Sequence, residues 1–259
     1  MDGAAGNRTR AFRGEWGVSI MPDPIGSPLV KIPKTPAAGN GAEGHRRRLR
    51  ERFLRNRLNG FQEYEILELL LTFAVARRDV KPIAREALRR FGSLTALLDA
   101  SGAKLLEVPG FGPASVVLVK LIRAVGDYYL EQPLRNCDVI ENRPAVLRYL
   151  RSKLGGGSKE TLMVLYLGSR NRLLDRQIYP GTVDRSGIYI REVVEHAVLC
   201  HATGVVIAHN HPSGMCTPSP EDRELTRRLD RALKALGLTL FDHFIVTRCA
   251  AISILGTDD

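Results

Sequence analysis

The spacing of apolar residues changes partway along the chain. Between residues 45 and 131 it is helical, and 63–75 is apolar around most of its circumference, which predicts a central buried helix. Two short helices are expected within 80–101, broken at Phe91 and Gly92. After a short helix near 105, a long helix is expected to begin at Pro113, because proline is favoured in the first turn. This region therefore predicts a small all-helical domain.

From residue 144 onward, strand-length apolar runs alternate with helical stretches. A helix over 144–154 and a glycine-rich loop precede two strands within 160–179, joined near residues 169–171. A short strand and an amphipathic helix are expected within 187–204, then a buried strand over 204–211 and a helix over 219–237. Two closing strands lie within 239–255. The alternation predicts an α/β domain with a mixed sheet.

The predicted organisation has four parts. Residues 1–44 are rich in Gly, Pro and small residues and are expected to be a disordered leader. The helical domain covers 45–131, a linker 132–143, and the α/β domain 144–259. Residues 109–115, PGFGPAS, form the turn before the long helix.

Composition narrows the class of protein. No apolar run approaches the roughly 18 residues of a membrane span, and the N-terminus lacks the apolar core of an export signal. The four cysteines are scattered, which favours reduced thiols and a cytoplasmic location. The net charge of +10 is concentrated in residues 46–131, which carry +6, led by the arginines of 45–57. Such a surface attracts DNA through its phosphates, although a solvated arginine-rich helix face explains it equally well.

The stretch 208–222, AHNHPSGMCTPSPED, is the strongest candidate for chemistry. Side chains alternate along a strand, so His209 and His211 point the same way and Asn210 points opposite. With Asp222 in the first turn of the next helix, they make a three-ligand zinc set that leaves a fourth position for water. The alternative is structural: Ser219 and Asp222 also form a good helix start without any metal. Cys216 lies nearby and is interpreted as a loop residue. The remaining candidates His196, His201 and His243 are interpreted as packing or surface residues, with a supporting shell around the site as the alternative for Asp242 and His243.

The turn PGFGPAS resembles the helix-hairpin-helix module of DNA-binding proteins. In that family, glycines corresponding to Gly110 and Gly112 let backbone N–H groups approach a phosphate at a helix N-terminus. Together with Arg46, Arg47 and Arg48, the turn predicts sequence-independent DNA contact. A plain glycine-containing helix hairpin, or a module for partner binding, remains the alternative.

The spacing H-x-H, ten residues, D, with Ser219 in register, matches the JAMM metalloprotease motif of the MPN domain. With a preceding helix-hairpin-helix domain, the chain resembles the RadC family over residues 45–257. The resemblance implies a cytidine-deaminase-like mixed sheet, Zn²⁺ held by His209, His211 and Asp222, and Ser219 as a donor to the developing oxyanion. It also implies a catalytic glutamate matching Glu160, with Glu192 and Glu195 as rivals. Without the resemblance, Glu160 is an ordinary charged residue that ends a glycine loop.

Two classes of function follow. One is a zinc hydrolase of amide bonds, peptide or isopeptide, whose DNA-binding module localises it. The other is a non-enzymatic DNA-associated accessory protein, in repair or processing, with a structural zinc site. The complete set of three ligands and Glu160 favours the first. The sequence does not identify the protein or peptide substrate.

Overall fold

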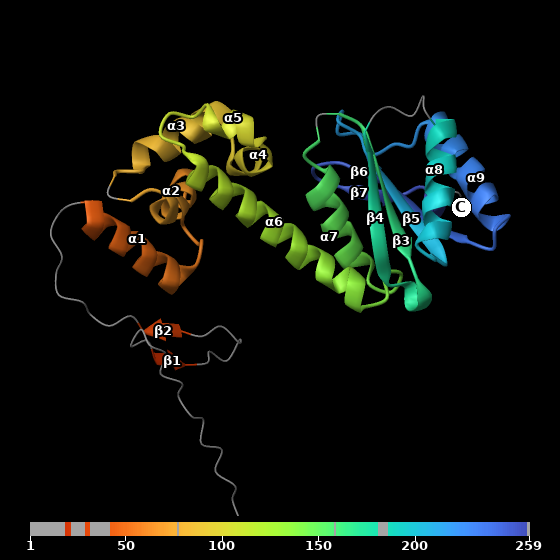
Figure 1. Cartoon of the computed structure of the whole chain (residues 1–259), viewed down its shortest axis with the longest axis horizontal. Helices are drawn as coiled ribbons and strands as arrows, with labels where there is room; N and C mark the ends of the chain where they lie inside the picture. Colours follow the sequence, from red (N-terminus) through yellow and green to blue (C-terminus); the bar gives the residue numbers. More distant parts are fainter. Residues whose placement is uncertain are drawn as a thin grey trace, which may run out of the picture. The chain divides into compact units, whose positions relative to one another are not determined.

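The computed structural model describes residues 19–21, 29–31, 42–76, 78–157, 159–180 and 186–257. The chain divides into two compact units, residues 1–121 and 122–259. Most of the expected disordered leader lies outside the described residues; its described part holds β1 (Ser19–Met21) paired antiparallel with β2 (Leu29–Lys31), and the start of α1 (Figure 1). Within the described ranges, no helix combines the length and apolar character needed to cross a membrane.

The described part of the first unit is helical from residue 42. Its helices are α1 (Ala42–Asn56), α2 (Glu63–Ala74), α3 (Lys81–Phe91), α4 (Leu94–Asp99) and α5 (Gly102–Leu106). Gly92 ends α3 with a φ of +80°, and the Ser93 and Ser101 side chains cap α4 and α5. The core is formed by apolar residues of α2 to α5 and their connections: Leu67, Leu71, Ala84, Ala87, Leu97, Leu105 and Phe111. The helix break predicted at Phe91 and Gly92 is confirmed.

The long helix α6 (Pro113–Asn136) contains the boundary between the units. It runs into the segment 132–143, which the sequence analysis expects to be a linker. There, Leu134 and Val139 are buried in the core of the second unit, so the segment is packed. A proline within a helix costs about 3 kcal/mol, and burying Leu134, the next residue of α6, offsets part of this cost by about 1.5–3 kcal/mol.

The second unit holds a five-stranded mixed sheet with the order β4-β3-β5-β6-β7. Its strands are β3 (Thr161–Leu167), β4 (Leu173–Pro180), β5 (Gly204–Asn210), β6 (Thr239–Val246) and β7 (Ala251–Ser253). Only the β5–β6 pair is parallel among these neighbours. The predicted mixed α/β fold is confirmed. The short strand expected at 187–190 is wrong: α8 (Ser186–Leu199) begins there, because Ile190, Val193 and Ala197 pack at helical spacing in one core.

Helices cover both faces of this sheet (Figure 1). On one face, α7 (Arg143–Leu154) packs over Val206 and Ala208 of β5. On the other face, α8 and α9 (Pro220–Lys234) pack over Val205 and Ile207. Since side chains alternate along a strand, His209 at the end of β5 belongs to the α8–α9 face, and Asn210 belongs to the α7 face.

Candidate metal centre

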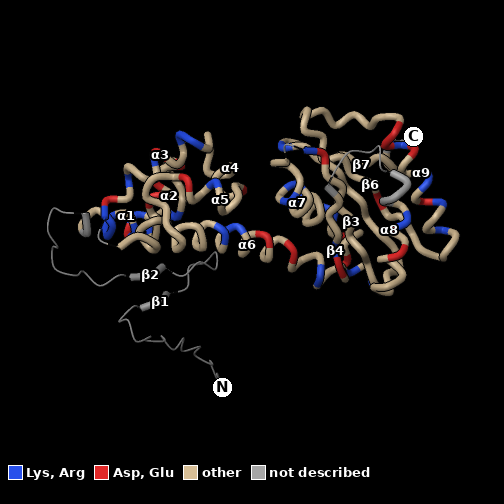
Figure 2. Tube along the Cα trace, turned by 45° about the horizontal axis from the view of Figure 1, so that its top comes forward, with Lys and Arg blue, Asp and Glu red and all other residues tan. Residues whose placement is uncertain are grey.

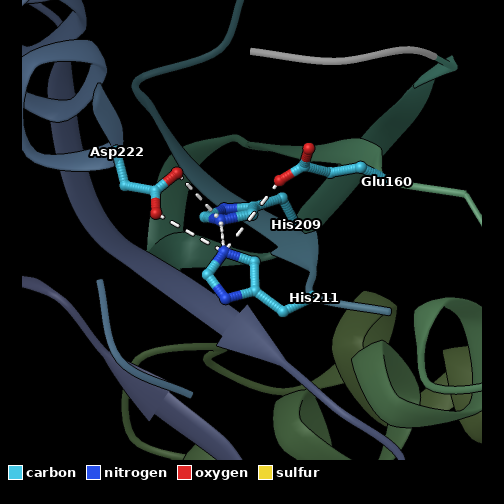
Figure 3. Close-up of side chains that lie close together, drawn as sticks. All are labelled: Glu160, His209, His211 and Asp222. Carbon is cyan, nitrogen blue, oxygen red and sulfur yellow. Dashed lines mark hydrogen bonds and ion pairs between the residues drawn. The ribbon is translucent and has the colours of Figure 1, made fainter. Parts of the chain in front are cut away.

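Four side chains converge at the carboxyl end of β5, where Asp222 and Glu160 approach the two imidazoles from opposite sides (Figure 3). The Nε2 atoms of His209 and His211 are 2.9 Å apart. Asp222 Oδ1 lies 3.0 Å from His209 Nε2, and its Oδ2 lies 3.4 Å from His211 Nε2. Glu160 Oε1 is 3.9 Å from His211 Nε2. One ligand atom from each of the four lies within 4.8 Å of the others.

The start of α9 fixes Asp222. Ser219 Oγ accepts a hydrogen bond from the Asp222 backbone N–H at 3.0 Å, and Asp222 Oδ2 accepts one from the Ser219 N–H at 2.8 Å. This reciprocal cap places a carboxylate that is only 1 % exposed beside the imidazoles. The structural interpretation of Ser219 and Asp222 is therefore confirmed. The same cap also brings Asp222 to the two histidines.

A buried hydrogen-bond chain sets the proton positions on His209. Thr226 Oγ1 donates to the Asp222 carbonyl at 2.7 Å, so it accepts from His243 Nδ1 at 2.6 Å. Complete burial, helped by the neighbouring His209 imidazole, holds the pKa of His243 well below its ordinary value and keeps this ring neutral. The Nε2 atom of His243 must then accept from His209 Nδ1, 2.8 Å away. In the neutral form that a metal ligand must have, His209 Nε2 therefore carries the lone pair.

The neighbouring His211 reaches the same state by a different route. Its Nδ1 atom donates to the Met215 carbonyl at 2.9 Å, so in the neutral ring Nε2 carries the lone pair. Two nitrogen lone pairs thus face each other at 2.9 Å. Beside them, the buried Asp222 Oδ1 accepts no hydrogen bond. A bound cation would satisfy all three atoms at once, so these residues fit a zinc ion.

The charge state of Asp222 agrees with this role. Burial alone would raise its pKa, but without the ion a proton shared with His209 Nε2 and the two contacts with Ser219 outweigh burial and hold the pKa below its ordinary value; a bound cation would take the place of that proton. Asp222 is therefore an ionised carboxylate at neutral pH. A carboxylate with two neutral imidazoles is a donor set typical of zinc sites.

Other candidates lie outside this group. Glu192 and Glu195 are on α8 and are not part of the four-residue cluster. Cys216 Sγ donates to Thr247 Oγ1 at 3.5 Å, consistent with its interpretation as a loop residue. His196 pairs instead with Asp175 at 2.9 Å.

A cavity of about 310 Å³ opens beside His211. Its lining comes from the loop after α7, the ends of β5 and β6, and the turn after β5: Gly155, Gly157, Asn210, His211, Pro212, Gly214, Val246 and Arg248. This space adjoins the His211 imidazole, and no motif in the sequence predicts it.

Two residues behind the site, Thr226 and His243, contribute to its geometry; from the sequence, Thr226 had no assigned role, and His243 was interpreted as a packing residue or as part of a supporting shell. Thr226 lies four residues after Asp222 on α9, so helical periodicity places both on one face. His243 could be placed only with the β5–β6 register, in which it neighbours Ile207. The helical spacing of Thr226 could be read from the sequence, whereas the strand register that places His243 could not.

In the first unit, the residues expected at a DNA surface differ in their surroundings. Gly110 has a φ of +92°, and a Cβ there would lie 2.7 Å from Ile83 Cδ1, so packing requires glycine. Nothing lies within 4 Å of a Cβ at Gly112. The fold therefore explains the glycine at position 110 and does not explain the one at position 112.

Arg46, Arg47 and Arg48 of α1 also differ, although arginines recur along this helix (Figure 2). The Arg46 guanidinium donates to the Val75 carbonyl at 2.9 Å and to the Arg78 carbonyl, both just beyond α2. Arg47 pairs with Glu51 at 3.7 Å. Arg48 is exposed. Of the three, Arg48 is the one whose side chain is most open to a ligand.

Comparison with known proteins agrees with both units. Residues 140–258 match the family described as RadC-like JAB domain, and residues 44–117 match the family described as UPF0758 N-terminal. The chain is similar to a UPF0758 protein of Fusobacterium nucleatum subsp. nucleatum, with 39% identity over 221 residues, 82% of this chain and 95% of that protein. The chain therefore belongs to the RadC family of UPF0758 proteins, with a C-terminal JAB domain.

Proposed function

We propose that this protein is a zinc-dependent hydrolase of amide bonds, peptide or isopeptide. The observation that carries the proposal is the pair of imidazole Nε2 atoms 2.9 Å apart, with the buried Asp222 carboxylate 3.0 Å from one of them. These three residues would hold the ion. Zinc, when bound there, supplies a Lewis acid that lowers the pKa of a coordinated water toward neutrality.

The two carboxylates are suited to different roles. Asp222 is 1 % exposed and lies 3.0 Å from His209 Nε2. Glu160 has a side chain that is 25 % exposed and is 3.9 Å from the nearest imidazole nitrogen. The closer, buried group suits a ligand, and the more distant, accessible group suits a general base. Glu160 would accept a proton from the attacking water as its oxygen bonds to the carbonyl carbon, then give that proton to the amide nitrogen as the C–N bond breaks.

Ser219 would donate to the oxyanion that forms at the carbonyl oxygen when the water attacks. Its Oγ already accepts the Asp222 N–H, but a hydroxyl has two acceptor positions and one proton to donate. The cap therefore leaves the Ser219 proton available. Helix capping and donation to the oxyanion therefore do not compete for the same hydroxyl proton.

Glu160→Gln tests this assignment, because glutamine keeps the shape of the side chain but cannot accept the proton. Zinc content at saturating zinc should remain about one per chain, while hydrolysis in a peptide and isopeptide screen falls by about 10²–10⁴-fold. Glu192→Gln on α8 is the matched control and should keep full activity. Equal activity in the wild type and Glu160→Gln would contradict the base role.

We also propose that the first unit binds DNA without sequence preference. The proposal is supported by the charge of +6 over residues 46–131, the exposed Arg48 and the open space at Gly112. The alternative function, a DNA-associated accessory protein with a structural zinc, shares this property. It differs in expecting no hydrolysis that depends on Glu160.

A further inference from the structure

Asn210 stands between the two histidines, but its side chain belongs to the opposite face of the sheet. It is 2 % exposed, and its amide makes three hydrogen bonds. Oδ1 accepts the Thr161 N–H at 2.8 Å, and Nδ2 donates to the carbonyls of Lys159 at 3.0 Å and Gly157 at 3.3 Å. Because a backbone N–H faces one end and carbonyls face the other, the amide orientation is fixed.

These three contacts surround Glu160 in the sequence. Thr161 and Lys159 are its two neighbours in the chain, so the Asn210 amide holds the backbone on both sides of it. Among the described residues, the only contact found for the Glu160 carboxylate is the 3.9 Å approach to His211. The position of this carboxylate is therefore set mainly by its backbone.

The fit between Asn210 and the loop is close. A Cβ at Gly157 would lie 3.0 Å from Asn210 Nδ2, so a larger residue there would press on the amide. Glycine at this position lets the backbone carbonyl approach the side chain. The loop before β3 and the end of β5 are thus fitted to each other at this amide.

We propose that Asn210 is the positioning residue for Glu160, and the inference rests on the proposed role of Glu160. One strand end presents two metal ligands on one face and, through Asn210, holds the general base from the other. The base and the ion would then keep a constant separation, because both are held by three consecutive residues. These are His209 and Asn210 of β5 and His211, which follows the strand. If Asn210 only held the loop in place, replacing it would not affect the metal centre through Glu160.

A double-mutant cycle on zinc affinity, measured by chelator competition, separates these roles without using activity. Glu160→Gln removes a negative charge near the ion, and Asn210→Ala displaces that charge, so each should weaken zinc binding by about 10-fold. In the Glu160→Gln background, Asn210→Ala should not weaken zinc binding any further. Equal effects of Asn210→Ala in both backgrounds would overturn the proposal and show that the histidines had moved.

Hydrogen exchange tests the clamp independently of zinc. In Asn210→Ala, the Thr161 amide should exchange at least about 10-fold faster, with Val164 and Ile207 unchanged as internal references. Gly157→Ala, which crowds the same amide, should act in the same direction if Asn210→Ala does not fold. Asn171→Ala is the matched control, since it removes an asparagine hydrogen bond to Asp138 elsewhere in the unit. Unchanged exchange at Thr161 would overturn the proposal, whereas a wild type that binds no zinc would instead defeat the proposed function.

Discussion

The two units use their polar residues in opposite ways. In the second unit, neighbouring side chains hold the candidate ligands: the buried His243 holds His209, and the half-buried Ser219 holds Asp222. In the first unit, several arginines are engaged in holding helices together, as Arg46 does at the end of α2. A small ion requires several atoms at fixed positions, whereas a phosphate backbone needs only positive charge on an accessible surface. Convergence of side chains therefore carries more functional information than composition does.

Removing a ligand should have the largest effect. His209→Ala takes away one of three donors and should reduce zinc from about one per chain to none, measured by elemental analysis of protein purified without chelators. Asp222→Ala should lose zinc as well and also weaken the cap of α9. Cys216→Ser is the control and should keep the metal. Loss of zinc in Cys216→Ser would show that the ligand set is wrong.

The residues behind the ligands come next. Thr226→Val keeps the shape but removes the oxygen that accepts from His243 Nδ1, so the proton position on His209 is no longer enforced. We expect zinc affinity to fall by about 10–100-fold in a chelator competition. Thr72→Val removes another buried hydroxyl, in α2, and should leave zinc affinity unchanged. Similar zinc affinity in both variants would mean that the hydrogen-bond chain does not matter to the metal.

Features that depend on residues close together in the sequence could be predicted, and features that depend on long-range contacts could not. The common direction of His209 and His211 and the cap at Ser219 are local, and both are visible in the pattern. Glu160 was assigned only through family resemblance, because its approach to His211 depends on how β3 lies beside β5. The Asn210 clamp spans about 50 positions in the chain, since it joins residue 210 to residues 157–161. Similarly, nothing in the helical pattern of α1 indicates that Arg46 reaches the end of α2.

The two glycines of the PGFGPAS turn are expected to differ in how much they contribute to the stability of the first unit. Gly110→Ala forces a side chain onto a φ of +92° and against Ile83, so it should lower the free energy of unfolding by about 1–3 kcal/mol. Gly112→Ala meets no neighbour and should change it by less than about 0.5 kcal/mol. Urea unfolding followed by circular dichroism measures both. If Gly112→Ala weakens DNA binding without affecting stability, the turn contacts DNA; equal stability losses would contradict the packing argument.

The smallest effect is expected at the arginines, and it tests whether the first unit has a ligand surface at all. Wild-type affinity for duplex DNA should fall as salt rises, with a log–log slope of about −0.9 per phosphate neutralised. Arg48→Gln should reduce the magnitude of that slope by about one contact and leave stability unchanged, because Arg48 is exposed. Arg46→Gln should instead lower stability, because the carbonyls of Val75 and Arg78 lose their donor, and should keep the slope while the protein remains folded. A flat salt response in the wild type would reduce this unit to a protein-interaction module, and equal slopes in Arg48→Gln and the wild type would place the phosphate contacts elsewhere.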